Sequence, residues 1–426
     1  MTLVKKFLLL VIPCLVYTKQ ELSAERPIQW MTVFVHGTTG ATSNISIANI
    51  YRVMADKVKN SCYEKAVDLI RTNPYMYKNQ PMQEYGLKRI DHKVGFSGDA
   101  SALFAHAYDA ILQETLNEDT HDHVYYTFGW SGLLGESIRY HNASVFYKEL
   151  LHEYHQQQIN NPHKEIKICL VAYSHGGTMT LQLARVFEKE LTHQPLTIDL
   201  LVLIGTPIQK ETSHLVTSPL FKKVYHIYSR GDKIQKLDFF SFERFFSHRR
   251  FNDDNRFVTP EKIIQIELKL KPARRAYKPG EKKTYVNRSP GHIELWFFGW
   301  TGGTYRHDFP LYPLPTACLI PQIIKAAQEG MPHETDLVVE LYPCAEKCLV
   351  KKRRYFKKVQ TKGIKQTTLK KLQETAHRER PQDFNRKEYL MHMQTAVNQA
   401  YQTVGHNHSW LSKCYDFSCK EREKRK

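Results

Sequence analysis

The stretch CLVAYSHGGTMTLQLA, residues 169–184, constrains the fold most strongly, because it joins an apolar strand pattern to a helical pattern at a serine. Residues 168–172 form a short continuous apolar run, which is typical of a strand covered on both faces. Ser174 follows this run, with Ala172 and Gly176 two residues to either side. A sharp strand-to-helix turn crowds those two positions. The pattern therefore predicts a turn that lifts the serine hydroxyl clear of the sheet.

Strand and helix patterns alternate on both sides of this turn. We expect strands over residues 29–35, 123–128, 197–204, 223–228 and 263–270, and helices over residues 100–116 and 143–157. Such alternation predicts an α/β fold with a mostly parallel sheet flanked by helices. The chain has 426 residues, of which 42% are hydrophobic, so it can bury a core of that size.

The first 24 residues are typical of a secretory signal peptide. Lys5 and Lys6 precede an apolar stretch over residues 7–16, and small residues before and at Ala24 suit cleavage after that position. The apolar stretch is shorter than the roughly 20 residues of a membrane-spanning helix. We therefore predict export to a secreted, periplasmic or cell-envelope location, and an uncleaved anchor is the alternative.

Positive charge is concentrated in the C-terminal part of the chain. The net charge is +18, and residues 345–426 hold 21 Lys and Arg against 8 Asp and Glu. We predict a main domain over residues 25–332, with an insertion over about 43–121, and a basic, helix-leaning extension over 333–426 that lacks strand patterns.

The cysteines allow several arrangements. Cys169 lies in the predicted buried strand, where we expect a free thiol. Export permits disulfides among the other cysteines of the exported chain, in a connectivity that spacing alone does not give. Zinc binding through the C-terminal cysteines is the alternative, although their spacing matches no standard zinc module. The six cysteines that could form disulfides are Cys62, Cys318, Cys344, Cys348, Cys414 and Cys419.

A serine becomes a nucleophile when a base takes its proton and a third group holds that base. Asp232 comes just after the strand expected at 223–228, and His292 lies in a Gly/Pro turn after the strand expected at 263–270. Both positions follow strand ends on the edge of the sheet where Ser174 is expected. We therefore predict that Ser174, His292 and Asp232 act together.

Other residues compete for these roles. Asp199 and Asp238 are rivals for the acid, and His307 is a rival for the base. Ser97 and Ser131 have glycine neighbours but lack the combination of an apolar strand before and a helix after them, so we interpret both as loop residues. Each predicted catalytic residue also has a structural interpretation, because serine commonly caps helices and aspartate is common in turns.

The small-x-Ser-x-Gly turn, the chain order Ser, Asp, His, and the pair His36-Gly37 after an early strand resemble the α/β-hydrolase superfamily, and lipases and serine esterases in particular. The resemblance covers roughly residues 27–328, with alanine at 172 where that family usually has glycine. It implies an oxyanion hole formed by the backbone N–H of His175 together with that of Thr38 or Thr39. It implies no cofactor and no metal.

We therefore predict an exported serine hydrolase that cleaves carboxylic esters, as lipases and esterases do. The alternatives are an acyltransferase with the same triad and a catalytically silent hydrolase-like binding protein. The expected partner is an ester or lipid substrate. The aromatic segment 236–251 is either a core helix or a lid over the serine. The basic segment 347–366 is either a solvated face or a binding site for an anionic membrane surface, and its few aromatics disfavour nucleic acid.

Overall fold

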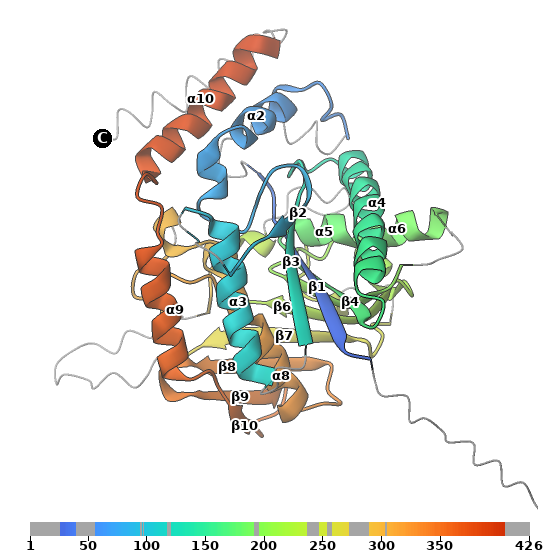
Figure 1. Ribbon diagram of the computed structural model, residues 1–426, viewed down its shortest axis with the longest axis vertical. Helices are drawn as coiled ribbons and strands as arrows, with labels where there is room; N and C mark the ends of the chain where they lie inside the picture. The colour runs from blue at the N-terminus through green and yellow to red at the C-terminus, as the bar shows by residue number, and fades with distance from the viewer. Residues whose placement is uncertain are drawn as a thin grey trace, which may run out of the picture.

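A single ten-stranded sheet organises the chain (Figure 1). The computed structural model describes residues 26–39, 56–93, 96, 98–116, 121–190, 196–236, 247–253, 258–271, 289–302 and 305–404. The strands are β1 (Ile28–Val35), β2 (Gly86–Ile90), β3 (His121–Gly129), β4 (Glu165–Tyr173), β5 (Ile198–Ile204), β6 (Phe221–Tyr228), β7 (Ile263–Leu270), β8 (Asp336–Tyr342), β9 (Lys347–Lys352) and β10 (Val359–Lys362). Their spatial order is β10-β9-β8-β7-β6-β5-β4-β1-β3-β2.

The centre of the sheet is parallel, from β3 through β1 and β4 to β8. Among the strands of the described residues, antiparallel pairs occur only at the two margins, where β2 pairs with β3 and β9 pairs with both β8 and β10. The fold is therefore of the α/β class, as the sequence predicts. The long apolar runs of β4 and β5 are explained by their burial on both faces.

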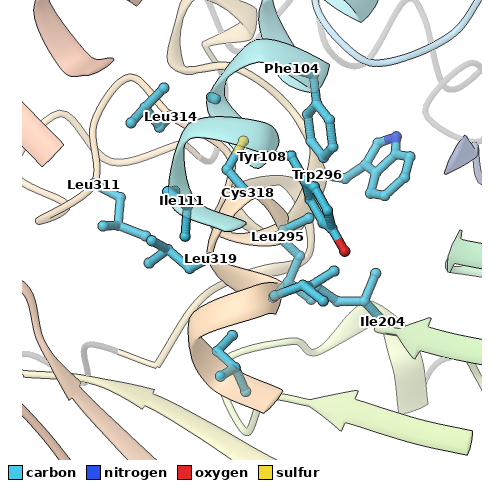
Figure 2. Packing of buried hydrophobic residues seen from close by; sticks show 14 of the residues in the cluster. Phe104, Tyr108, Ile111, Ile204, Leu295, Trp296, Leu311, Leu314, Cys318 and Leu319 are labelled. Carbon is cyan, nitrogen blue, oxygen red and sulfur yellow. The ribbon is translucent and has the colours of Figure 1, made fainter. Parts of the chain in front are cut away.

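Helices cover both faces of the sheet (Figure 1). One apolar cluster packs α4, α5 and α6 against the sheet, and the other packs α3, α7 and α8. Figure 2 shows the second cluster, where Phe104 and Tyr108 of α3 lie close to Leu295 and Trp296 of α7. These helices are α3 (Ala100–Leu116), α4 (Glu136–Asn160), α5 (His175–Leu181), α6 (Leu183–Lys189), α7 (His292–Trp296) and α8 (Ile320–Gly330).

The remaining helices lie away from the centre of the sheet. Helix α9 (Gln366–Arg378) packs near α3, and α10 (Arg386–Val404) packs along α2 (Cys62–Arg71) (Figure 1). Small apolar clusters join α2 to α10 through residues such as Ile70 and Met393. None of the helices in the described part of the chain combines the length and the apolar character that a membrane span requires.

The prediction that residues after 332 contain no strands was wrong. β8 pairs in parallel with β7, and the β9–β10 hairpin extends the same sheet, so the sheet continues across the boundary predicted at 332. The physical reason is burial on one face only. Val350 and Cys348 are buried against α8, whereas lysines alternate with them on the other face, and this mixture obscures the strand pattern.

Four cysteines in the described part of the chain are free thiols. Cys169 is a buried free thiol, as predicted, and burial raises its pKa to about 12. Cys318, Cys344 and Cys348 are also free thiols, so the disulfides considered for these three are not present among the described residues. Cys414, Cys419 and the signal peptide over residues 1–24 lie outside the described residues.

Candidate active site

Ser174 occupies the sharp turn between β4 and α5. Its backbone has φ 51° and ψ −132°, a conformation that non-glycine residues rarely adopt. Its N–H donates to the carbonyl of Ile204 over 3.0 Å, which continues the β4–β5 pairing to the last residue before the helix. Strain of this kind costs about 1–3 kcal/mol and persists only where the surroundings impose it.

Glycines around Ser174 allow the close packing that imposes this conformation. A Cβ at Gly176 would lie 2.1 Å from the carbonyl oxygen of His36, and a Cβ at Gly177 would lie 2.1 Å from Oγ1 of Thr206. A Cβ at Gly37 would lie 2.9 Å from Cβ of Ser174. A larger residue at Gly176 would require a backbone shift, and one at Gly37 or Gly177 would require the neighbouring side chain to move. The small residues that flank the serine are therefore explained by contact rather than by flexibility.

The structure brings Ser174, His292 and Asp232 together. Nε2 of His292 lies 3.0 Å from Oγ of Ser174, and Nδ1 lies 2.7 Å from Oδ2 of Asp232. Asp232 follows β6 and His292 begins α7, so the two side chains approach the serine from loops beyond the strand ends. The three residues form the hydrogen-bonded chain that a base-activated serine requires.

Asp232 is fully buried, and each of its oxygens has a partner. Oδ1 accepts the backbone N–H of Gln235 over 3.0 Å, while Oδ2 faces His292. The Arg249 guanidinium donates to the Asp232 backbone carbonyl over 2.6 Å. The Gln235 side chain in turn donates to the carbonyl of Thr206 over 2.7 Å. These contacts fix the carboxylate and compensate the cost of burying it.

An ion pair between the half-buried Arg306 and the buried Glu294 holds the loop that carries His292. Glu294 is 1% exposed and accepts four hydrogen bonds: from the backbone N–H of Gly291, and from the backbone N–H, Nε and Nη2 of Arg306. Arg306 also donates to the carbonyl of Ser289 over 3.1 Å. The pair therefore ties Ser289 and Gly291, which come just before His292, to Glu294 in α7. Its charged hydrogen bonds are bidentate, because Nε and Nη2 of Arg306 donate to different oxygens of Glu294.

Aromatic rings support His292 from the core side. The Tyr173 hydroxyl donates to the His292 backbone carbonyl over 2.9 Å, and the two ring centroids lie 4.8 Å apart. The ring of Trp296 also stacks on the ring of Tyr173, with an interplanar angle of 2°. The imidazole thus rests on a rigid aromatic surface rather than on a mobile loop.

The His36 loop lies against the serine and has its own support. Nδ1 of His36 donates to the carbonyl of Gly37, and Nε2 accepts from the buried guanidinium of Arg71 and from the backbone N–H of Trp130, each over 3.2 Å. The Trp130 indole donates to the His36 carbonyl over 2.8 Å. Burial, strengthened by the nearby Arg71 charge, lowers the pKa of His36 to about 3, so this histidine is neutral at physiological pH.

One predicted oxyanion donor is already used. The Thr39 N–H donates to the carbonyl of Gly132 over 3.3 Å, so of the two alternatives the structure favours Thr38. Gly132 makes this contact at a φ of +74°, and a Cβ at this position would lie 2.3 Å from Oγ1 of Thr39. His175 is the first residue of α5, directly after Ser174, and Thr38 follows Gly37, which packs against Ser174.

The rival residues lie elsewhere in the structure or outside it. His307 is exposed, and its ring contacts Tyr312. Asp199 lies at the start of β5, where it accepts from the Ile168 N–H and pairs with Lys222. Ser131 lies in the β3–α4 loop, as predicted. Ser97, Asp238 and most of the aromatic segment 236–251 lie outside the described residues, although the Phe251 side chain is fully buried in the core.

Three supporting residues were missed by sequence reasoning. Glu294 occupies the third position after Gly291, a helix-capping spacing that the sequence does offer. Arg71 and Arg306 leave no local signal, because their partners are brought near by the fold. Within the described ranges, no three His, Cys, Asp or Glu side chains gather into a group that could hold a metal ion.

Comparison with protein-family models gives no match to this chain. Comparison with curated proteins and with solved structures gives no match either. Its function is therefore inferred from the geometry of its own residues.

Proposed function

We propose that this protein is an exported serine hydrolase of the α/β-hydrolase type that cleaves carboxylic esters. The observation that carries the proposal is the chain of two hydrogen bonds, 3.0 Å from Ser174 to His292 and 2.7 Å from His292 to Asp232. A strained serine in a glycine-lined turn supports the same proposal, because such strain is found where function requires it.

In the proposed mechanism, Oγ of Ser174 attacks the ester carbonyl while Nε2 of His292 takes its proton. The imidazolium then returns a proton to the leaving alcohol, which leaves an acyl group on the serine. Water attacks this acyl-enzyme with His292 again acting as base, and the carboxylic acid departs. Asp232 keeps the Nδ1 proton in place and stabilises the imidazolium throughout.

The oxyanion of each tetrahedral intermediate needs hydrogen-bond donors close to Ser174. We assign this role to the backbone N–H groups of His175 and Thr38, on the analogy with the α/β-hydrolase arrangement. The contacts of His36 with Arg71 and Trp130 support the assignment, because they hold the loop that carries Thr38 against the serine. Fixed donors of this kind typically contribute several kcal/mol to lowering the barrier.

The test is hydrolysis of p-nitrophenyl butyrate by Ser174→Ala. Only a hydroxyl is lost, so the variant should remain folded while turnover falls by roughly 10⁴-fold or more. Ser131→Ala is the matched control, since Ser131 is also a buried serine beside glycine but accepts hydrogen bonds from Leu133 of its own loop and from Asn142 of α4. Activity near that of the wild type in a folded Ser174→Ala protein would refute the assignment of the nucleophile.

A further inference from the structure

The β9–β10 hairpin ends in an exposed aromatic pair within a basic run. Its connecting residues 353–358 read RRYFKK. The Phe356 side chain is 99% exposed and that of Tyr355 is 60% exposed. Single exposed apolar residues are ordinary on protein surfaces. Two adjacent exposed aromatics between pairs of cations are a different arrangement, which suits a partner that accepts both kinds of group.

The base of this hairpin is firmly held. β9 pairs with β8 and with β10, and Val350 is fully buried against α8. The Gln322 side chain on α8 donates to the carbonyl of Lys362 over 2.8 Å. At the other end, the N–H of Arg353 donates to the carbonyl of Asp336 over 3.1 Å. The tip is therefore presented to solvent by ordered sheet.

The cations next to the strands have carboxylate partners, whereas those beside the aromatic pair have none among the described residues. At the base of the hairpin, lysines pair with buried or half-buried carboxylates, Lys351 and Lys358 with Glu340 and Lys352 with Glu334. Arg354 and Lys357, the two residues that flank the aromatic pair, are exposed and form no ion pair with any described residue. The end of the hairpin is thus both apolar and uncompensated in charge.

We propose that the tip of the β9–β10 hairpin binds the surface of an anionic phospholipid membrane. Phe356 and Tyr355 enter the boundary between headgroups and acyl chains, where amphipathic aromatic rings are favoured. Arg354 and Lys357 keep their charges at the level of the phosphates and attract anionic lipid. The proposal is independent of ester hydrolysis, since it involves none of the residues near Ser174.

A nucleic acid is the less suitable partner for this surface. Proteins that bind single strands present several aromatic rings along a basic groove, so that successive bases can stack. The hairpin presents one adjacent pair at the end of two strands, with Tyr355 already covered on one side by the Lys352 ammonium, 5.2 Å from its ring centre. That geometry suits shallow insertion better than stacking.

The direct test places a reporter at the proposed point of insertion. Full-length Phe356→Trp is mixed with vesicles of phosphatidylcholine containing phosphatidylglycerol, and with vesicles of phosphatidylcholine alone. We expect a blue shift of the added tryptophan emission, and quenching by brominated acyl chains, with the anionic vesicles only. An emission spectrum that does not change with anionic vesicles would overturn the proposal.

Paired variants separate the two contributions to binding. Tyr355→Ser with Phe356→Ser should weaken binding to anionic vesicles by roughly ten-fold or more, because apolar burial is lost. Arg354→Gln with Lys357→Gln should weaken it by about five-fold for each cation removed, and raised salt should reduce the difference from wild type. Ile159→Ser is the matched control, since Ile159 is 68% exposed near the end of α4, away from the hairpin.

All these variants should hydrolyse a soluble ester at the wild-type rate, so a failure of membrane binding is distinguishable from a failure of the proposed function. Equal vesicle binding by wild type and the paired variants would overturn the proposal. It would equally be overturned if Phe356 were needed instead for binding a single-stranded oligonucleotide, or for dimer formation on gel filtration.

Discussion

The turn at Ser174 and the tip of the β9–β10 hairpin present side chains in opposite ways. At the turn, Asp232 is fully buried, Ser174 is 4% exposed, and every oxygen of the Asp232 carboxylate has a partner. At the tip, Phe356 has almost no protein contact, and the charges beside it have no carboxylate partner among described residues. The difference teaches that chemistry requires atoms fixed by packing, whereas attachment to a surface requires groups left available.

Each region lowers the free energy of unfolding of the protein. The backbone of Ser174 holds about 1–3 kcal/mol of strain. Leaving Phe356 in water forgoes about 1.5–3 kcal/mol that burial of such a side chain would contribute. The extensive core on both faces of the sheet supplies the stability that makes these local losses tolerable.

The largest effect should come from the buried side of this comparison. Asp232→Asn should lower turnover by roughly 10⁴-fold, because the imidazole loses the partner that fixes its tautomer. Asp199→Asn is the control. Asp199 also accepts a backbone N–H, but it lies at the start of β5, whereas Ser174 contacts Ile204 at the end of that strand. If Asp199→Asn lowers turnover and Asp232→Asn does not, the acid is misassigned. Steady-state hydrolysis of a soluble ester measures both.

Removing the support of His292 should have an intermediate effect. Glu294→Gln weakens the contacts to Arg306 and Gly291, so the imidazole is held less firmly and kcat should fall by roughly 10–100-fold. KM should change little, because Glu294 is buried behind the loop rather than facing the serine. Glu340→Gln is the control, since Glu340 is a buried, lysine-paired carboxylate on β8.

A change in KM without a change in kcat would contradict this positioning role. A purely structural role for Glu294 would lower the melting temperature and leave kcat of the folded fraction intact. Thermal unfolding measured beside the kinetics therefore distinguishes the two.

The buried region should also make stability depend on pH. Burial lowers the pKa of His226 to about 3, as it does for His36, where the Arg71 charge also contributes. The unfolded state takes up protons near pH 6.5 and the folded state only near pH 3, so stability is fully present above pH 6.5 and falls as pH decreases. Each histidine should contribute a slope of about 1.4 kcal/mol per pH unit between those values.

His226→Gln removes one of these titrations. Urea unfolding at several pH values from 6 to 4 should show a shallower decline than in the wild type. An identical slope in wild type and His226→Gln would show that His226 is protonated in the folded state.

The smallest effect should come from the exposed side. Phe356→Ala should change the free energy of unfolding by less than about 0.5 kcal/mol, because the ring has no core contacts to lose. Phe34→Ala, in β1 with a fully buried ring, should cost about 3–5 kcal/mol. Chemical denaturation of both variants tests the contrast, and a large loss at Phe356 would show that the tip packs against the protein.

Local patterns carried most of the prediction from sequence. The strands from β1 to β7 other than β2, and the small residues around Ser174, are visible because each depends on its immediate neighbours. Asp232 and His292 were predicted because parallel strands end at one edge of the sheet. Strand β8 was missed because Glu340 interrupts its short apolar run, and the hairpin was missed because lysines alternate with its buried residues.

The supporting contacts depend on the whole fold. Arg71 reaches His36 only after α2 has packed beside the His36 loop, and the Thr39 N–H is withdrawn from the oxyanion position by Gly132 in a distant loop. Arg306 meets Glu294 across a turn that no residue spacing specifies. Sequence can therefore suggest which groups react, while the fold determines which groups hold them.

The most direct measurement is labelling of the full-length protein with a fluorophosphonate probe, followed by mass-spectrometric mapping of the modified residue. Such probes react with a serine only when a base activates it. We expect a single adduct on Ser174, absent from Ser174→Ala and strongly reduced in Asp232→Asn. A folded wild-type protein that takes up no label, or that takes it up on another serine, would contradict the account.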